Sequence, residues 1–284
     1  MRQSKRAYQW YVAGPPRALR RMLLAVGWIA LCWTLAVSAS LLRPFATCRM
    51  QHVCKRLSKL WIRGVLRITG IRIKVEGEVP AQPYFLVANH ITWADYFVMN
   101  SLVDAVCVVQ AEDEKIPVLG RLMKGLNPVF VRRTRDDIAR TVNLMTEHIR
   151  KGRSLLMAPE GIVSPGKTVR RFRPALLESA VLTETPVHYA SITCRTPEGY
   201  PPASRIALFG PDPYYRTPDG KIPDSELEAW GPERSFLWHL LRLLSLPWHE
   251  FTVRFAPEPV SARDRHVLAN NLQQAVSTIF TPVQ

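Results

Sequence analysis

A stretch of 21 residues without a charged side chain, Met22 to Leu42, constrains this chain more than any other feature. As a helix, the stretch would reach about 30 Å, the thickness of a bilayer core. A buried core helix and a signal peptide are the alternatives, and Ala36, Ser38 and Ser40 loosely resemble a cleavage site. Because the apolar region of a signal peptide is shorter, the pattern favours a segment that enters a membrane. Basic residues on both sides leave its orientation undecided.

The formal net charge of +15 comes entirely from the same part of the chain. The first 75 residues contain 15 Lys and Arg and no acid, whereas the remainder contains 23 Lys and Arg and 23 Asp and Glu. A nucleic-acid-binding domain more often carries its basic patch on a folded surface of mixed charge. Basic residues around an apolar segment instead indicate anionic lipid. We therefore expect membrane lipid as a partner and no nucleic acid, with an anchored nucleic-acid-binding protein as a rival interpretation.

Residues 45–69 have the pattern of an amphipathic helix in a membrane interface. Apolar residues recur with helical spacing at Met50, Val53, Leu57, Leu60, Trp61, Gly64 and Ile68, opposite Arg49, His52, Arg56, Lys59, Arg63 and Arg67. We predict that residues 1–70 are basic membrane-anchoring helices. Two helices dipping into one leaflet and a true membrane span both remain open.

After Gly70 the pattern changes to strands that alternate with helices. Strands are predicted at 71–75, 84–88, 106–109, 129–131, 155–157, 187–193, 205–209 and 251–255, and helices at 118–126, 136–151, 174–184, 236–246 and 264–280. The alternation predicts a single domain, 71–284, with an α/β sheet covered on both faces. His90, Arg133 and Glu160 each follow a predicted strand, so we expect them on one rim of the sheet.

His90 and Asp95 are the first candidates for chemistry. If a helix begins just after His90, Asp95 lies a little over one turn further and can reach back to the imidazole. A carboxylate on one ring nitrogen fixes the tautomer and leaves the other nitrogen as a base. Such a base can take the proton of an alcohol that attacks a thioester. A capping or core histidine near an unrelated acid is the alternative, and the spacing alone does not decide between them.

Four blocks in order resemble the motifs of the glycerolipid acyltransferase family, which includes the bacterial lysophosphatidate acyltransferases. The blocks are Asn89-His90-Ile91-Thr92-Trp93-Ala94-Asp95, similar to NHxxxxD; Asn127-Pro128-Val129-Phe130-Val131-Arg132-Arg133; Ala158-Pro159-Glu160-Gly161; and Thr185-Pro186-Val187-His188-Tyr189-Ala190. The stretch Phe172-Arg173-Pro174-Ala175 after the third block also fits. The order of the blocks is far more specific than any one of them.

The resemblance implies a mixed sheet flanked by helices, preceded by a membrane-associated helix pair, and a direct acyl transfer in phospholipid biosynthesis. His90 would be the general base and Asp95 its orienting partner. Arg133, Glu160 and Gly161 would bind the head group of the acceptor. The acyl donor would be acyl-CoA or acyl carrier protein, with no covalent acyl-enzyme, no metal and no cofactor.

The third block departs from the family pattern. Ile162-Val163-Ser164 stands where the family usually has Thr-Arg-Ser or Thr-x-Ser, although Lys167, Arg170 and Arg171 lie close by. The leading acceptor remains 1-acyl-sn-glycerol-3-phosphate, and this departure keeps lyso-ornithine lipid or another lysophospholipid as alternatives. A non-catalytic membrane scaffold with the same fold is the rival of another class. A serine hydrolase is poorly supported because no Gly-x-Ser-x-Gly elbow occurs.

The five cysteines indicate the compartment. Their number is odd and none forms a Cys-x-x-Cys pair, which argues against a disulfide framework and a structural zinc site. We expect a reduced protein on a membrane surface, at the cytoplasmic face of the inner membrane if the source is bacterial.

Overall fold

The computed structural model describes residues 2–41, 48–111, 114, 128–132, 134–206 and 236–283. Within these ranges it describes side chains from residue 14 onward, except at 33, 36–41, 48–55, 205–206 and 236–238. The predicted helix at 118–126 lies outside the described residues.

The described strands form a seven-stranded mixed sheet in the order β1-β7-β6-β2-β5-β3-β4. The strands are β1 (Ile71–Glu76), β2 (Phe85–Ala88), β3 (Val106–Gln110), β4 (Val129–Val131), β5 (Leu155–Met157), β6 (Val187–Arg195) and β7 (His249–Phe255). Neighbouring strands are parallel except β6 and β7, which pair antiparallel. The predicted mixed sheet flanked by helices is therefore confirmed.

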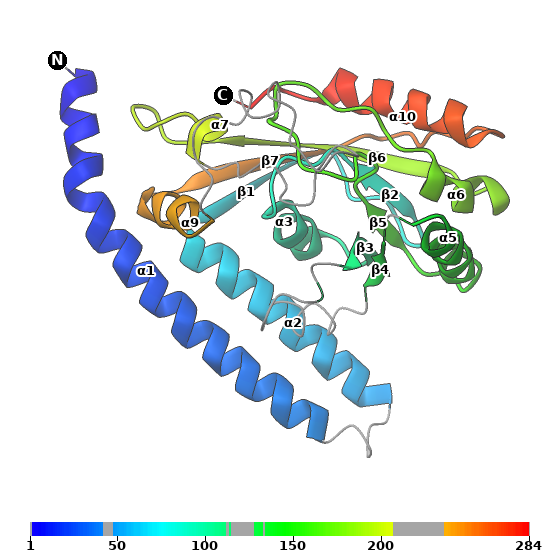
Figure 1. Cartoon of the computed structure of the whole chain (residues 1–284), viewed down its shortest axis with the longest axis horizontal. Coiled ribbons are helices and arrows are strands. Elements are labelled where there is room, and N and C mark those ends of the chain that lie inside the picture. Colours follow the sequence, from blue (N-terminus) through cyan, green and yellow to red (C-terminus); the bar gives the residue numbers. More distant parts are fainter. Residues whose placement is uncertain are drawn as a thin grey trace.

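Both faces of the sheet are buried, as the strand β2 shows most directly. Phe85 and Val87 join a cluster with α10 (Arg265–Ile279) and α5 (Arg135–Arg150) on one face. Leu86 and Ala88 join the cluster with α2 (Cys48–Thr69) and α3 (Asp95–Leu102) on the other. Figure 1 shows α10 on one side of the sheet and α2 and α3 on the opposite side. Because alternate residues of a strand point to opposite faces, a strand buried on both is apolar throughout.

The helices of the domain begin at polar caps. Asp264 accepts hydrogen bonds from the backbone N–H groups of His266 and Val267 at the start of α10. Thr134 caps α5, where its Oγ accepts from the N–H of Asp137, so the helix predicted from residue 136 begins one residue earlier, at Arg135. The extended backbone of Thr134 is the conformation that an N-cap requires. The predicted helix at 174–184 is a 3₁₀ turn, η3 (Ala175–Leu177), followed by the short α6 (Glu178–Leu182).

One predicted strand is wrong where the structure tests it. Residues 205–206 of the strand predicted at 205–209 belong to a short helix, α7 (Ala203–Ile206), and residues 207–209 lie outside the described ranges. Pro201 and Pro202 precede this helix, and the fixed φ of proline suits the start of a helix better than a paired strand.

Two long helices precede the sheet and lie side by side, α1 (Arg2–Leu41) and α2 (Figure 1). Trp28 of α1 donates to the carbonyl oxygen of Trp61 at 3.1 Å and fills the space beside Gly64. The buried face of α2 differs from the expected one, because Ile62 and Leu66 are buried whereas Leu60 is half exposed. The helix packs on α3, β1 and α1 together, and this rotates the buried stripe relative to an isolated amphipathic pattern.

The helix α1 is also held to α9 (Phe236–Ser245) at the far end of the domain. Arg17 donates to the carbonyl oxygen of Ser245 at 2.7 Å, and Arg21 donates to Leu246 and Pro247. The last carbonyl groups of a helix have no partner within it, so Arg17 satisfies that of Ser245, whereas Arg21 binds the residues that follow the helix. Among the described residues, no helix combines the length and the apolar character needed to cross a membrane.

Candidate active site

Two neighbouring parallel strands bring the candidate residues together. β2 and β5 pair in register from Phe85–Leu155 to Val87–Met157. His90 follows the end of β2 and Glu160 follows the end of β5. Because the carboxyl ends of parallel strands meet at one edge, the two residues lie on the same rim, as the sequence predicted.

Asp95 and His90 form a direct contact at this rim. The Nδ1 of His90 and the Oδ2 of Asp95 are 2.9 Å apart. The same Oδ2 accepts the backbone N–H groups of Ile91 at 2.7 Å and Thr92 at 3.0 Å. The helix α3 begins at Asp95 itself, so a turn that precedes the helix makes the contact rather than a helical repeat. The carboxylate is therefore fixed by the backbone of the segment that also carries the histidine.

The two side chains differ in their access to solvent. Asp95 is 5 % exposed in its side chain, whereas His90 is 25 % exposed. The Oδ1 of Asp95 is buried and has no hydrogen-bond partner among the described residues. A buried carboxylate against one nitrogen of a partly exposed imidazole is an arrangement suited to proton transfer at the other nitrogen.

The carboxylate of Glu160 accepts hydrogen bonds from two backbone N–H groups of the site. Its Oε1 accepts the N–H of His90 at 2.9 Å, and its Oε2 accepts the N–H of Arg170 at 3.3 Å. Burial raises the pKa of Glu160 to about 7, and these two backbone hydrogen bonds partly oppose the shift. A group that is 2 % exposed and occupied by two backbone donors serves to position the chain around it.

Gly161 occupies a place that other residues fit poorly. Its φ of +70° lies in the left-handed region, and an added Cβ would lie 3.2 Å from the Cδ of Arg173. Gln110, at the end of β3, donates to the carbonyl oxygen of Gly161 at 3.0 Å. The turn after β5 is thus fixed by the neighbouring strand.

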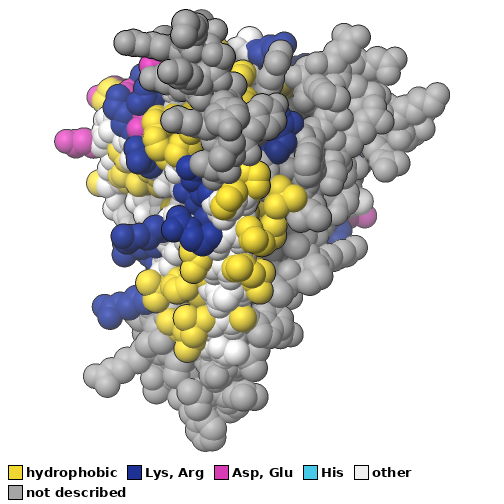
Figure 2. All heavy atoms as spheres, turned by 90° about the vertical axis from the view of Figure 1, so that its left-hand side faces the viewer, with side chains coloured by type: hydrophobic (Ala, Val, Ile, Leu, Met, Phe, Trp, Pro, Cys, Tyr) yellow, Lys and Arg dark blue, Asp and Glu magenta, His cyan; other side chains and the backbone are white. Residues whose placement is uncertain are grey.

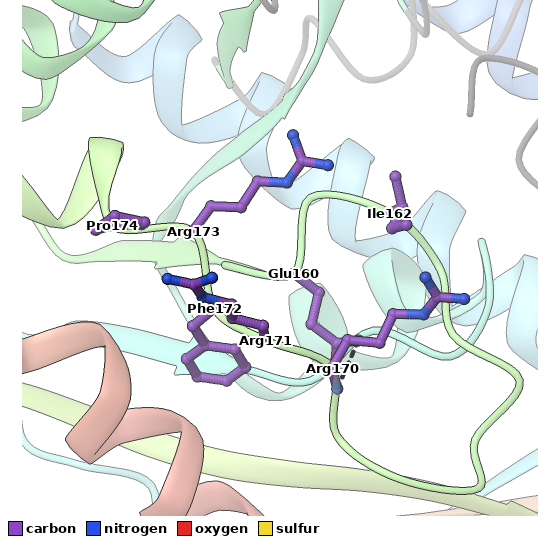
Figure 3. Close-up of a pocket in the computed structure, with 7 residues that line it drawn as sticks. All are labelled: Glu160, Ile162, Arg170, Arg171, Phe172, Arg173 and Pro174. Carbon is purple, nitrogen blue, oxygen red and sulfur yellow. Dashed lines mark hydrogen bonds between the residues drawn. The ribbon is translucent and has the colours of Figure 1, made fainter. Parts of the chain in front are cut away.

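A cavity of about 490 Å³ opens beside this turn. It is lined by Glu160, Ile162, Arg170, Arg171, Phe172, Arg173 and Pro174. Figure 3 shows the three arginine side chains, Arg170, Arg171 and Arg173, which come from one short stretch of the chain around this cavity. Arginine binds phosphate and carboxylate oxygens in a forked geometry, so the cavity suits an anionic group.

The structure brings together four of the five predicted site residues, namely His90, Asp95, Glu160 and Gly161. Arg133, the fifth, lies outside the described residues. Lys167, expected near the third block, does not line the cavity, whereas Arg170 and Arg171 do.

The sequence did not predict the contacts of two residues near the rim, Asn89 and Gln110. Asn89 exchanges hydrogen bonds with the backbone of Ile192, at 2.9 Å and 2.6 Å, and so extends the pairing of β2 with β6 by one residue. The other is Gln110, for which the available signal was a polar residue at the end of an apolar strand. Within the described part of the chain, no group of three or more His, Cys, Asp or Glu side chains could hold a metal ion.

Comparison with known proteins identifies the family. Residues 72–193 match the family model described as Acyltransferase, and this range contains the whole rim described above. Residues 72–193 therefore belong to the Acyltransferase family, and the named relatives of the chain are glycerolipid acyltransferases. It is an acyltransferase, and residues 72–193 carry its contacts between His90, Asp95 and Glu160.

Relatives of the chain carry the names of two kinds of lysolipid acyltransferase. The chain is 28 % identical to the lyso-ornithine lipid O-acyltransferase of Pseudomonas aeruginosa over 92 % of both chains. It is 30 % identical to the 1-acyl-sn-glycerol-3-phosphate acyltransferase of Neisseria meningitidis over 42 % of this chain and 48 % of that one. The crystal structure of the 1-acyl-sn-glycerophosphate acyltransferase of Thermotoga maritima superposes with a TM-score of 0.58 at 18 % identity, covering 93 % of this chain and 97 % of that one. This likeness shows a shared fold.

Proposed function

We propose that this acyltransferase moves a fatty acyl group from a thioester to the hydroxyl of a lysolipid. The contact between His90 Nδ1 and Asp95 Oδ2 at 2.9 Å carries the proposal. With Nδ1 engaged by the carboxylate, the Nε2 of His90 takes the proton of the acceptor hydroxyl as its oxygen attacks the thioester carbonyl. The new C–O bond forms, the C–S bond breaks, and the leaving thiolate receives a proton. Asp95 stabilises the imidazolium that forms in between.

The acceptor head group is proposed to bind in the cavity beside Glu160. Arg133, Glu160 and Gly161 are the residues that the family resemblance assigns to this task. The geometry supports adding Arg170, Arg171 and Arg173, whose side chains line the cavity. Glu160 acts through the backbone groups that it holds, because both of its oxygens accept N–H groups of the chain.

Lyso-ornithine lipid is the first acceptor proposed, and 1-acyl-sn-glycerol-3-phosphate is the second. The relative named for the former matches 92 % of both chains, which reverses the order expected from the motifs alone. Both acceptors present an anionic group to the arginines. The proposed donor is acyl-CoA or acyl carrier protein, without a cofactor or metal.

The helix pair is proposed to place the site at a membrane surface and to form the anchoring segment 1–70 ahead of the catalytic domain 71–284. Large apolar side chains of α1 are strongly exposed, including Leu23 at 65 %, Leu19 at 62 % and Val26 at 61 %. Figure 2 shows a band of apolar side chains on this side of the molecule, with Lys and Arg side chains along one edge. Exposed apolar groups beside basic ones favour the interface of an anionic leaflet.

The test is acyl transfer from radiolabelled acyl-CoA, and separately from acyl carrier protein, to a panel of lysolipids in detergent. His90→Ala is compared with the intact protein and with His266→Ala, a change at an exposed histidine on α10. Loss of a general base costs on the order of 100-fold or more in rate. Transfer that collapses in His90→Ala alone supports the proposal and names the acceptor. Transfer that survives there would overturn the role of His90, and no transfer to any acceptor would favour a scaffold.

A further inference from the structure

The segment that forms the cavity has no regular structure of its own. Residues 158–174 contain neither helix nor strand, yet they supply all seven lining residues. Side chains on such a segment hold their direction through contacts that fix the backbone beneath them. The contacts that hold this backbone therefore bear on where the arginines point.

One peptide unit in this segment is held at both of its polar ends. The carbonyl oxygen of Val169 accepts a hydrogen bond from the Nε2 of Gln273, on α10, at 3.2 Å. The N–H of Arg170, in the same peptide unit, donates to Glu160 at 3.3 Å. Figure 3 shows this second contact as the link between Glu160 and Arg170. Because a peptide unit is planar, fixing both ends sets the orientation of the chain where Arg170 leaves it.

A second contact from the same side of the molecule supports this arrangement. The N–H of Val283, beyond the end of α10, donates to the carbonyl oxygen of Gly166 at 2.8 Å. The N–H of Gly166 donates to the Oγ of Ser164, whose own N–H donates to the carbonyl oxygen of His90. The segment is thus tied to α10 on one side and to the histidine on the other.

From these contacts we infer that Gln273 is a positioning residue for the acceptor head group, acting through the Val169–Arg170 peptide to aim Arg170 into the cavity. The inference rests on the proposed lysolipid transfer and adds a residue that does not itself line the cavity. The side chain of Gln273 is itself held on its helix, since its Nε2 also donates to the Oγ of Ser277 at 3.3 Å. The acceptor it serves is one with an anionic head group, whether phosphate or carboxylate.

The first measurement is steady-state transfer by the full-length protein with Gln273→Ala, Gln274→Ala and the intact chain. Gln274 is the exposed neighbour on the same helix and serves as the matched control. Loss of one net hydrogen bond predicts a rise of about three- to tenfold in the KM for the acceptor in Gln273→Ala. The kcat and the KM for the acyl donor stay at their original values. Equal acceptor KM values in all three proteins would overturn the inference.

A double-mutant cycle separates positioning from a general structural role. If Gln273 acts through Arg170, then Gln273→Ala has no further effect on the acceptor KM in a protein that already carries Arg170→Ala. A merely structural role would add the same factor in both backgrounds, and that result would refute the inference.

Backbone amide exchange tests the contact without any activity. Mass spectrometry of exchange is expected to show faster exchange over the peptide that contains Arg170 in Gln273→Ala than in Gln274→Ala. Identical exchange in the two variants would overturn the inference even if transfer is observed. If the intact protein transfers to no acceptor, the proposed function fails, and the exchange result alone decides whether Gln273 holds this segment.

Discussion

Asp95→Asn tests the pairing with His90 more sharply than removal of either side chain. The Oδ2 of Asp95 accepts two backbone N–H groups besides the imidazole, so the amide oxygen of an asparagine is expected to occupy this position. The amide nitrogen then replaces Oδ1, which is buried and has no partner among the described residues. The geometry and the tautomer of His90 are preserved, and the negative charge is lost.

The expected loss of rate follows from the charge that develops on His90. At the observed 2.9 Å, a full charge pair at an effective dielectric near 20 is worth at most about 6 kcal/mol. The His90 side chain is 25 % exposed, and solvent reduces this value. We therefore expect kcat to fall on the order of 10² to 10³-fold, with a smaller change in KM. The unsatisfied amide donors cost about 1–3 kcal/mol of folding stability.

The assay is single-turnover transfer of a radiolabelled acyl group, combined with thermal unfolding of the same preparations. The double variant His90→Ala with Asp95→Asn should be no slower than His90→Ala, because the two residues act as one unit. An Asp95→Asn protein that remains folded and keeps nearly the full kcat would refute the catalytic role of this carboxylate.

Two further predictions concern the turn after β5. The pKa of Glu160 is raised to about 7, so between about pH 4.5 and 7 the folded state binds more protons than the unfolded state. The free energy of unfolding therefore falls as the pH rises through this range, by on the order of 3 kcal/mol. Denaturant unfolding across this range should show that slope, and Glu160→Gln should abolish it; an unchanged slope contradicts the assignment. Gly161→Ala is expected to cost about 1–3 kcal/mol and to raise the acceptor KM, because its φ is +70° and its Cβ position is crowded. Gly152→Ala is the matched control, since Gly152 has a φ of +66° and nothing lies within 4 Å of an added Cβ; equal acceptor KM values in the two variants would show that crowding at Gly161 is unimportant.

The amino-acid pattern determined the order of the helices and strands, because apolar residues recur along each element with the period of that element. Phe85 to Ala88 is apolar without interruption, which predicted a strand, and the alternation of strands with helices predicted a sheet covered on both faces. Asp264 marked the start of α10 because its side chain can satisfy backbone donors that the helix leaves open. The placement of His90 and Glu160 on one rim followed from the same reasoning, since parallel strands end together.

Other features depend on contacts between residues far apart in the sequence, which no local period encodes. The buried face of α2 includes Ile62 because α1, α3 and β1 all pack against that helix. Glu160 lines the cavity, and only the tertiary structure shows that its carboxylate also accepts the backbone N–H groups of His90 and Arg170. The sequence by itself therefore determined most of the strand positions and the candidates for the chemistry. The tertiary structure decided which atoms meet, because hydrogen bonds between residues 70 positions apart form only once the sheet has assembled.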